Sequence, residues 1–356
     1  MISFESDYNN GAHPALLQHL LDTNNAQSAS YGYDQWSISA REKIRDACQC
    51  PVADIFFLTG GTQANATVID ALLPSYGAVV ACTTAHINVH ESGAVEASGH
   101  KVITIPSHEG RMTAQDLNDY LERFHADPTW EHMAFPGMVY ITFPTELGTI
   151  YQAADIEAIH DVCQRFQIPL FIDGARLGYG LAAEGCDITL PWLAHHCEAF
   201  YIGGTKVGAL CGEAVVFPGG APPHFFTIVK RHGALLAKSR VAGVQFDALF
   251  TSHLVPRTSH LVPRTSYLYL SISRHAISMA MRLRQLFIRA GIPIKDSPTN
   301  QQFVTLTNQQ MNHLMEHVLF ETWEPIDADH TLCRFVTSWA TTDDDLQVLA
   351  ETLQQL

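Results

Sequence analysis

Short runs of apolar residues alternate with amphipathic stretches between about residues 52 and 217. The runs predict strands at 55–58, 79–82, 102–105, 138–141, 169–172, 200–202 and 214–217. Amphipathic stretches at about 62–73 and 155–166 predict helices between some of these strands. Strands that are apolar on both faces and separated by helices are typical of an α/β fold with a mostly parallel sheet between helices. Ligands of such sheets bind at the carboxyl ends of the strands.

The pattern changes after about residue 245. It then predicts a long helix near 271–290, a strand near 303–306, a helix from 311, a strand near 334–336 and a closing helix. Thr342 and the three aspartates after it supply a cap and an acidic first turn for this last helix. We expect a large α/β domain, including the N-terminal segment, over residues 1–245 and a smaller α+β domain over 246–356.

A short tandem repeat interrupts the start of the second domain. Residues 251–257 recur letter for letter as 258–264. Each copy contains a proline, which excludes a coiled-coil heptad. Each copy also contains Leu-Val-Pro-Arg, which resembles a thrombin-cleavage sequence, so an engineered origin is an open explanation. We interpret 251–264 as an exposed insertion and assign it no function.

Composition and charge exclude several classes of protein. With 47% hydrophobic and 16% charged residues, the chain of 356 residues is typical of a folded globular protein. Its net charge of −15 opposes the basic surface that nucleic acid requires. No apolar run approaches the roughly 18 residues of a membrane span. The sequence therefore favours a small-molecule partner over nucleic acid or membrane.

Cysteine and histidine usage points to a cytoplasmic protein without a metal site. Eight cysteines are scattered along the chain, which favours reduced thiols over a disulfide framework. The first residues show no basic segment followed by an apolar core, so we see no secretory signal. The 19 histidines show none of the tight ligand spacings of a metal site.

Three short motifs follow predicted strands. Gly60-Gly61-Thr62 opens a predicted helix, where a phosphate can bind backbone N–H groups, although an ordinary turn explains the same letters. Asp173 ends a predicted strand and is followed by Arg176, whose guanidinium can bind a carboxylate or a phenolate. Alternatively, Asp173 caps a helix and Arg176 lies at the surface.

Lys206 completes the set. It follows a strand and two glycines in an apolar stretch, where a Schiff base would remove its charge, and snorkelling to solvent is the alternative. A phosphate cradle, an acid for a protonated ring nitrogen and a nucleophilic lysine are together the parts that bind pyridoxal 5′-phosphate.

These motifs resemble those of the L-threonine aldolase and aromatic β-eliminating lyase family of fold-type I pyridoxal-phosphate enzymes. The resemblance extends over nearly the whole chain and implies a large domain like that of aspartate aminotransferase. It implies that Lys206 forms a Schiff base with the cofactor and that Asp173 pairs with the pyridine nitrogen. It also implies that Gly60, Gly61 and Thr62 bind the phosphate.

The same resemblance assigns further residues. His86 lies in a segment similar to the one in which the family's histidine stacks on the cofactor ring, and His90 is the alternative residue for that role. Ser6, Arg176 and Arg334 match residues that hold the substrate carboxylate, and Arg176 also belongs to the implied cofactor site.

The resemblance also implies an oligomer. Tyr33 lies in a loop that resembles one reaching a neighbouring subunit's active site, which implies a homodimer or homotetramer with shared sites and gives Tyr33 a place in substrate binding. A basic cluster lies where such enzymes lend a phosphate-binding side chain to the partner, and we do not choose among its members: Lys230, Arg231, Lys238 and Arg240.

One segment departs from the family. Residues 143–149 lack the histidine implied to contact the substrate's β-hydroxyl, and Glu146 stands at about its place. A carboxylate can accept that proton, and a structural hydrogen bond in a turn is comparably plausible. The base is therefore open among His86, His90 and Glu146.

The resemblance implies retro-aldol cleavage of a threonine-like or phenylserine-like L-β-hydroxy-α-amino acid to glycine and an aldehyde. A β-eliminating lyase that acts on an aromatic or sulfur amino acid is the nearer alternative. A non-catalytic member of the family is the more distant one.

Overall fold

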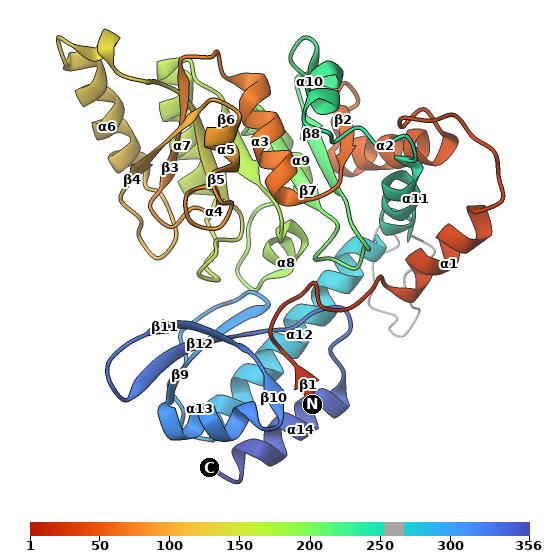
Figure 1. Cartoon of the computed structure of the whole chain (residues 1–356), viewed down its shortest axis with the longest axis vertical. Coiled ribbons are helices and arrows are strands. Elements are labelled where there is room, and N and C mark those ends of the chain that lie inside the picture. The colour runs from red at the N-terminus through yellow and green to blue at the C-terminus, as the bar shows by residue number, and fades with distance from the viewer. Residues whose placement is uncertain (253–266) are drawn as a thin grey trace.

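The structure is a computed structural model that describes residues 1–252 and 267–356. Apart from its first two positions, the predicted insertion at 251–264 lies outside the described residues. The described chain forms a larger α/β part and a smaller part that holds the C-terminus, and the long helix α12 (Leu268–Arg289) runs from one to the other (Figure 1).

A seven-stranded sheet forms the centre of the large part, in the order β2-β8-β7-β6-β5-β3-β4. The strands are β2 (Asp54–Leu58), β3 (Gly77–Cys82), β4 (Lys101–Ile105), β5 (Phe135–Thr142), β6 (Leu170–Asp173), β7 (Ala199–Gly203) and β8 (Glu213–Phe217). Strand β8 is antiparallel to both of its neighbours, and the other pairings are parallel. The predicted mostly parallel sheet is confirmed, and each predicted run corresponds to one of its strands.

Helices flank this sheet, and the two predicted ones are confirmed within one or two residues as α3 (Gly61–Leu72) and α7 (Ala153–Phe166). The others are α4 (His86–Val89), α5 (Ala94–Ala97), α6 (Ala114–Ala126), α8 (Leu177–Ala182), α9 (Leu190–His195) and α10 (Phe225–Arg231), with a 3₁₀ turn at Trp130–His132. The central strands β3, β6 and β7 are buried along their whole length, as expected for strands covered on both faces.

Three helices not predicted from the sequence form a separate layer. They are α1 (Pro14–Thr23), α2 (Gln35–Cys48) and α11 (Arg240–Leu249), and α11 packs against both of the others. The Asp34 carboxylate caps α2 by accepting a hydrogen bond from the Ser37 N–H at 2.9 Å. The predicted domain boundary at 245/246 lies inside α11, and this division of the chain stays a prediction.

The small part has an antiparallel sheet in the order β11-β12-β9, formed by β11 (Glu321–Pro325), β12 (His330–Val336) and β9 (Gln301–Thr307). Helices α12, α13 (Asn308–Met315) and α14 (Asp343–Leu353) accompany it. Thr342 caps α14 in a reciprocal capping box with Asp345, which confirms the start predicted for the closing helix.

The N-terminal segment packs with the C-terminal part of the chain. Strand β1 (Ile2–Ser3) pairs in parallel with β10 (Val318–Leu319), and Phe4 is buried in the small hydrophobic core beside Phe335. The N-terminus accordingly lies on the small part in Figure 1. From there the chain passes Asp7 and Tyr8 on its way to α1, which brings both residues to the junction between the two parts.

Candidate active site

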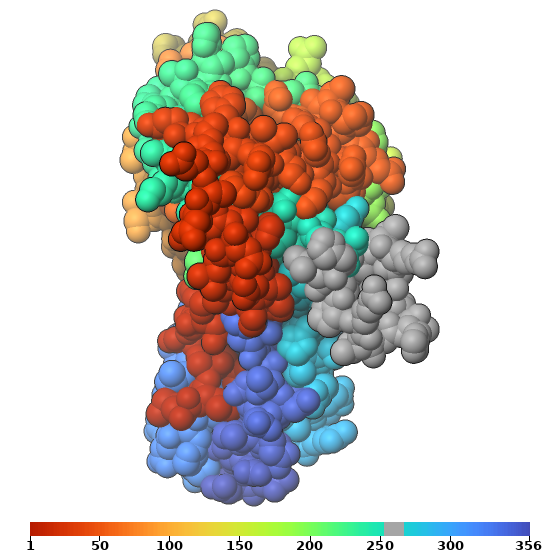
Figure 2. Space-filling view, turned by 90° about the vertical axis from the view of Figure 1, so that its right-hand side faces the viewer, coloured from red at the N-terminus to blue at the C-terminus, as the bar shows by residue number. Residues whose placement is uncertain are grey.

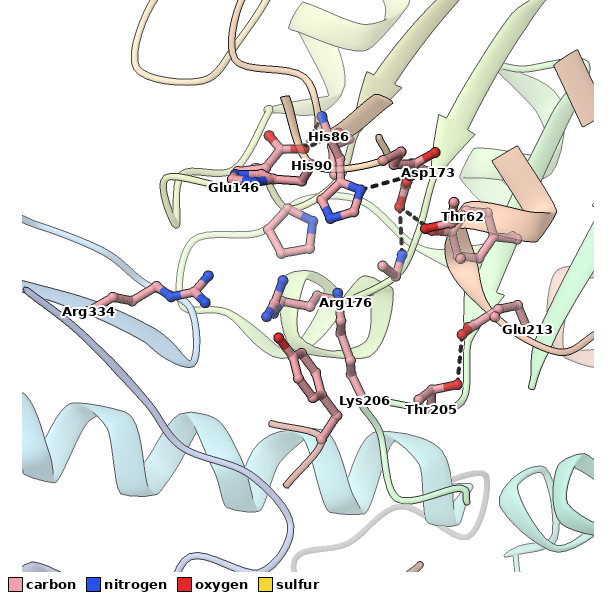
Figure 3. Close-up of a pocket in the computed structure, with 18 of the residues that line it drawn as sticks. Thr62, His86, His90, Glu146, Asp173, Arg176, Thr205, Lys206, Glu213 and Arg334 are labelled. Atoms are coloured by element: carbon pink, nitrogen blue, oxygen red, sulfur yellow. Dashed lines mark hydrogen bonds and ion pairs between the residues drawn. The ribbon is translucent and has the colours of Figure 1, made fainter. Parts of the chain in front are cut away.

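A cavity of about 470 Å³ opens at the carboxyl ends of β5, β6 and β7, where the two parts of the chain meet (Figure 3). The N-terminal segment contributes Tyr8 to its wall, and the small part contributes Glu321, Trp323 and Arg334. Most residues predicted for the site line this one cavity. They are Gly60, Gly61, Thr62, His86, His90, Glu146, Asp173, Arg176, Lys206 and Arg334.

The first turn of α3 forms one end of the cavity. No side chain caps this helix, so its leading N–H groups are left for another acceptor. A Cβ atom at Gly61 would lie 3.0 Å from the Tyr201 hydroxyl, which explains why the tight turn carries glycine. An uncapped turn of N–H groups, with the Thr62 hydroxyl beside it, suits a phosphate.

Asp173 ends β6 between two strands that each direct a tyrosine at it. Its Oδ1 accepts hydrogen bonds from the Tyr201 hydroxyl at 2.5 Å and the Ala175 N–H at 2.9 Å. Its Oδ2 accepts from the Tyr140 hydroxyl at 2.6 Å and the Asn65 amide at 2.9 Å. Four donors fix this buried carboxylate at the cavity wall.

His86 begins α4 and is held at both its backbone and its ring. Its N–H donates to Glu146 Oε1 at 3.0 Å, and its Nδ1 lies 2.8 Å from Glu91 Oε1. The Asn65 amide donates to the same Glu91 oxygen at 2.7 Å and also to Asp173. A single amide therefore links the carboxylate that orients His86 to Asp173.

Lys206 follows β7 on a turn that Glu213 of β8 holds in place. The Glu213 carboxylate accepts hydrogen bonds from the Gly204 N–H at 3.0 Å and the Thr205 hydroxyl at 2.8 Å. Burial lowers the pKa of Lys206 to about 8, with a further contribution from the Arg176 charge. Burial likewise raises the pKa of Glu213 to about 8. An amine of this kind is readily available as a nucleophile.

The two arginines reach the cavity from different parts of the chain (Figure 3). Arg176 forms a buried, bidentate ion pair with Asp7, with N···O distances of 2.8 and 3.0 Å. Arg334 pairs with Glu321, donates to Gln301 at 2.8 Å, and lies 4.8 Å from the Trp323 ring centroid. The buried Nε of Arg334 has no partner among the described residues. A free N–H on a buried cation suits a carboxylate.

Glu146 and His90 differ in how they can accept a proton. Glu146 Oε1 accepts from the Thr142 hydroxyl at 2.7 Å as well as from His86, whereas its buried Oε2 has no partner among the described residues. Burial raises the pKa of Glu146. Burial and the neighbouring His86 lower the pKa of His90. Both groups are therefore able to act as bases.

Ser6 and Tyr33 are predicted site residues that do not line the cavity. Ser6 is buried, and its hydroxyl donates to Asn9 at 2.9 Å. The residue of this N-terminal segment that lines the cavity is instead Tyr8. The Tyr33 side chain is 64% exposed and its ring lies 6.2 Å from that of Phe226. Their assigned roles stay predictions.

The structure also separates the members of the predicted basic cluster. Arg231 forms an ion pair with Asp70. Lys230 and Arg240 each lie over an aromatic ring. Lys238 is exposed, and within residues 1–252 and 267–356 its ammonium group has no hydrogen-bond or ion-pair partner.

Sequence reasoning missed several residues that shape the site: Tyr8, Asn65, Glu91, Tyr140, Tyr201, Glu213, Gln301 and Trp323. A signal was present for the two strand tyrosines, because a buried hydroxyl needs a hydrogen-bond partner. Asp173 ends the strand between theirs. The amides and Glu91 carried no comparable signal.

Comparison with known proteins identifies the family. The family model for beta-eliminating lyases matches residues 4–308. This chain belongs to that family. A similar relative, the low specificity L-threonine aldolase of Pseudomonas aeruginosa, is 32% identical over 218 residues. That match spans 60% of this chain and 61% of the relative, and the corresponding enzyme of Pseudomonas sp. strain NCIMB 10558 matches to the same extent.

Solved structures extend the likeness over the whole chain of this family member. The threonine aldolase of Leishmania major is 33% identical, with a TM-score of 0.92 over 100% of this chain and 99% of that one. An aspartate aminotransferase from Thermus thermophilus, 14% identical, gives a TM-score of 0.68 over 100% of this chain and 91% of that one. The second likeness confirms the predicted aspartate-aminotransferase-like fold.

The described residues contain neither a cluster suited to a metal ion nor a membrane-spanning helix. No group of three or more His, Cys, Asp or Glu side chains there is arranged to hold a metal ion. No helix there is long and apolar enough to span a membrane. All eight cysteines are free in the structure.

Proposed function

We propose that this chain is a pyridoxal-phosphate-dependent lyase that cleaves L-threonine-like or phenylserine-like β-hydroxy-α-amino acids to glycine and an aldehyde. The observation that carries the proposal is the convergence of Lys206, Asp173 and His86 on one cavity that also contains two arginines and an uncapped helix start. The likeness to threonine aldolases over the whole chain supports the same reaction.

The donor set fits the proposed cofactor at each of its functional groups. Lys206 would hold it covalently, and His86 would stack on its ring. Asp173 would pair with the pyridine nitrogen, while Gly61 and Thr62 would bind the phosphate. When bound, this cofactor supplies a protonated, electron-withdrawing ring that accepts electrons from a bond at the substrate's Cα.

Asp173 would keep the ring nitrogen protonated. The hydrogen bonds from Tyr140, Tyr201, Asn65 and Ala175 hold its carboxylate in one orientation and stabilise its negative charge. An anion held in this way stabilises a cation beside it without further reorganisation of the site.

Arg334 and Arg176 would bind the substrate carboxylate. Arg334 lines the cavity, and its terminal nitrogens are held by Gln301 and Glu321. A carboxylate fixed at this end of the cavity determines which bond at Cα stands perpendicular to the ring, and this selects the bond that breaks.

Glu146 is the base that we assign to the β-hydroxyl proton. Its Oε2 is a buried acceptor without a partner among the described residues, and its raised pKa strengthens it as a base. Its Oε1 bonds to Thr142 and His86 keep the side chain in place. His90 and His86 are the alternative bases.

The proposed active unit is a homodimer, or a tetramer of such dimers, with shared sites. Helices α1 and α2 lie on the upper part of the face shown in Figure 2, and apolar side chains on and beside them are exposed, including Leu17, Leu21 and Ile38. Tyr33, beside these helices, would reach the partner's cavity. Lys238 would supply the cation that the partner's phosphate site needs.

The free thiols support the cytoplasm as the proposed location, because unpaired thiols persist there in reduced form.

Product analysis tests the proposed reaction. Purified protein supplied with pyridoxal phosphate is incubated with L-threonine, L-allo-threonine, phenylserine or tryptophan, and the products are identified. Glycine with an aldehyde is the expected result. Ammonia with a 2-oxo acid would instead assign β-elimination, which gives 2-oxobutanoate from threonine, phenylpyruvate from phenylserine, and pyruvate with indole from tryptophan. A protein that binds cofactor but releases neither set of products would be a non-catalytic family member.

A further inference from the structure

Arg334 depends on one buried amide for its orientation. Gln301, the first residue of β9, is fully buried, and its Oε1 accepts the hydrogen bond from Arg334 NH1 at 2.8 Å. The opposite edge of the guanidinium pairs with Glu321, which lies partly in solvent. Gln301 is therefore the interior contact that fixes the orientation of the Arg334 guanidinium at the cavity.

The other end of the same amide is also occupied. Gln301 Nε2 donates to the Thr145 carbonyl at 3.2 Å. Thr145 precedes Glu146 in the segment that departs from the family pattern. Nearby, the Ser297 hydroxyl donates to the Gly148 carbonyl of the same loop at 2.7 Å. The amide thus connects the carboxylate-binding arginine to the loop that carries the proposed base.

Asn300, the neighbouring residue, holds the second arginine indirectly. Its amide donates to Asp7 Oδ2 at 2.9 Å, and Asp7 forms the bidentate pair with Arg176. Asn300 is fully buried, and its amide also donates to the Thr337 carbonyl at 2.9 Å. Two consecutive amides of the small part therefore support both arginines of the cavity.

We infer that Gln301 is a positioning residue that aligns Arg334 for the substrate carboxylate and couples it to the Glu146 loop. This inference rests on the proposed function, because it takes the ligand of Arg334 to be the carboxylate of an α-amino acid. Gln301 is not among the residues that line the cavity, so it would act through Arg334.

Gln301→Met tests the inference, because methionine keeps the volume of the side chain and removes both hydrogen bonds. Gln302→Met is the matched control: Gln302 is equally buried on the same strand, and within the described part of the chain its amide donates only to the Ser297 and Thr299 carbonyls, at 3.1 and 2.8 Å. Each variant is loaded with pyridoxal phosphate and titrated with glycine and with methylamine, which lacks a carboxylate. Binding is followed by the visible absorbance of the cofactor.

The expected result is a change specific to the carboxylate. Losing one hydrogen bond to a charged group weakens glycine binding by about tenfold or more in Gln301→Met, with methylamine binding unchanged within about twofold. KM for the cleaved amino acid rises by a similar factor while kcat falls less than about threefold. Gln302→Met should bind both ligands like the wild type.

Glycine binding by Gln301→Met within about twofold of the wild type would overturn the inference, as would equal weakening in Gln302→Met. If Gln301→Met does not fold, Gln301→Asn serves instead. It keeps an amide but shortens the side chain by one carbon, which withdraws the acceptor from Arg334, so glycine binding should again weaken and methylamine binding should not. Failure of the proposed function is a separate outcome, since the wild type would then release no glycine and aldehyde.

Discussion

The Asp7–Arg176 ion pair offers a sharp test of the interior electrostatics. The Asp7 carboxylate is fully buried, Arg176 is 10% exposed, and the pair is closed by two hydrogen bonds, with a third from Asn300. Asp7→Asn removes the negative charge that compensates the Arg176 guanidinium. It also places an NH₂ group opposite the N–H donors of Arg176. Removing one partner of a buried pair costs about 3–5 kcal/mol. That loss is a large fraction of the free energy of unfolding of a typical protein, which is roughly 5–15 kcal/mol.

Urea unfolding followed by circular dichroism measures this loss, as a lower midpoint at an unchanged slope. Asp296→Asn is the control, because Asp296 pairs with Arg284 but its side chain is 87% exposed, and such a pair contributes about 0–1 kcal/mol. Equal losses of stability in the two variants would refute the reasoning.

The same pair predicts a pH dependence with a definite sign. Burial raises the pKa of Asp7, but the charges of Arg176 and Lys206 and the hydrogen bonds from Arg176 and Asn300 outweigh this, and the pKa lies below its ordinary value of 3.8. The contribution of a carboxylate with a depressed pKa is complete above the unfolded pKa and is lost as the pH falls through the folded one. The difference in unfolding free energy between wild type and Asp7→Asn should therefore shrink as the pH falls below 3.8.

Three further predictions concern the cofactor. Lys206→Ala should abolish both turnover and the visible band of covalently held pyridoxal phosphate, and an unchanged adduct after borohydride reduction, located by mass spectrometry, would contradict the assignment. Asp173→Asn should still bind the cofactor but lose at least about a hundredfold in kcat, because a neutral amide does not hold the ring proton; near-normal kcat would argue against this role. Because burial lowers the pKa of Lys206 to about 8, uptake of pyridoxal phosphate by the cofactor-free protein should accelerate as the pH rises through 8, and a rate independent of pH between 7 and 9 would exclude this amine as the nucleophile.

The sequence predicted the parts of the fold that local patterns determine. Continuous apolar runs located all seven strands of the central sheet, since a strand covered on both faces has no polar side. The antiparallel direction of β8 was not predicted, because apolar runs do not encode pairing direction. Strands β1 and β10, of two residues each, are too short to show a recognisable pattern of apolar and polar residues.

The sequence likewise predicted only some of the residues of the candidate site. Asp173 and Lys206 could be found because each follows a strand that is readily recognised, so topology alone brings them to one edge of the sheet. Gln301 and Glu91 could not be found in this way. The role of a buried amide or acid depends on which group it bonds to, and the sequence does not show that partner. Arg334, the partner of Gln301, is distant in sequence and meets it only through the pairing of β9 with β12.

The pairing of β1 with β10 has a consequence for how the molecule is made. The first residues leave the ribosome long before Val318 and Leu319 are synthesised, so β1 waits unpaired through nearly all of translation. Asp7 and Tyr8, which follow β1, reach their final positions only after that late strand has emerged. A nascent chain stalled before residue 318 would carry a finished central sheet and an unfinished binding cavity.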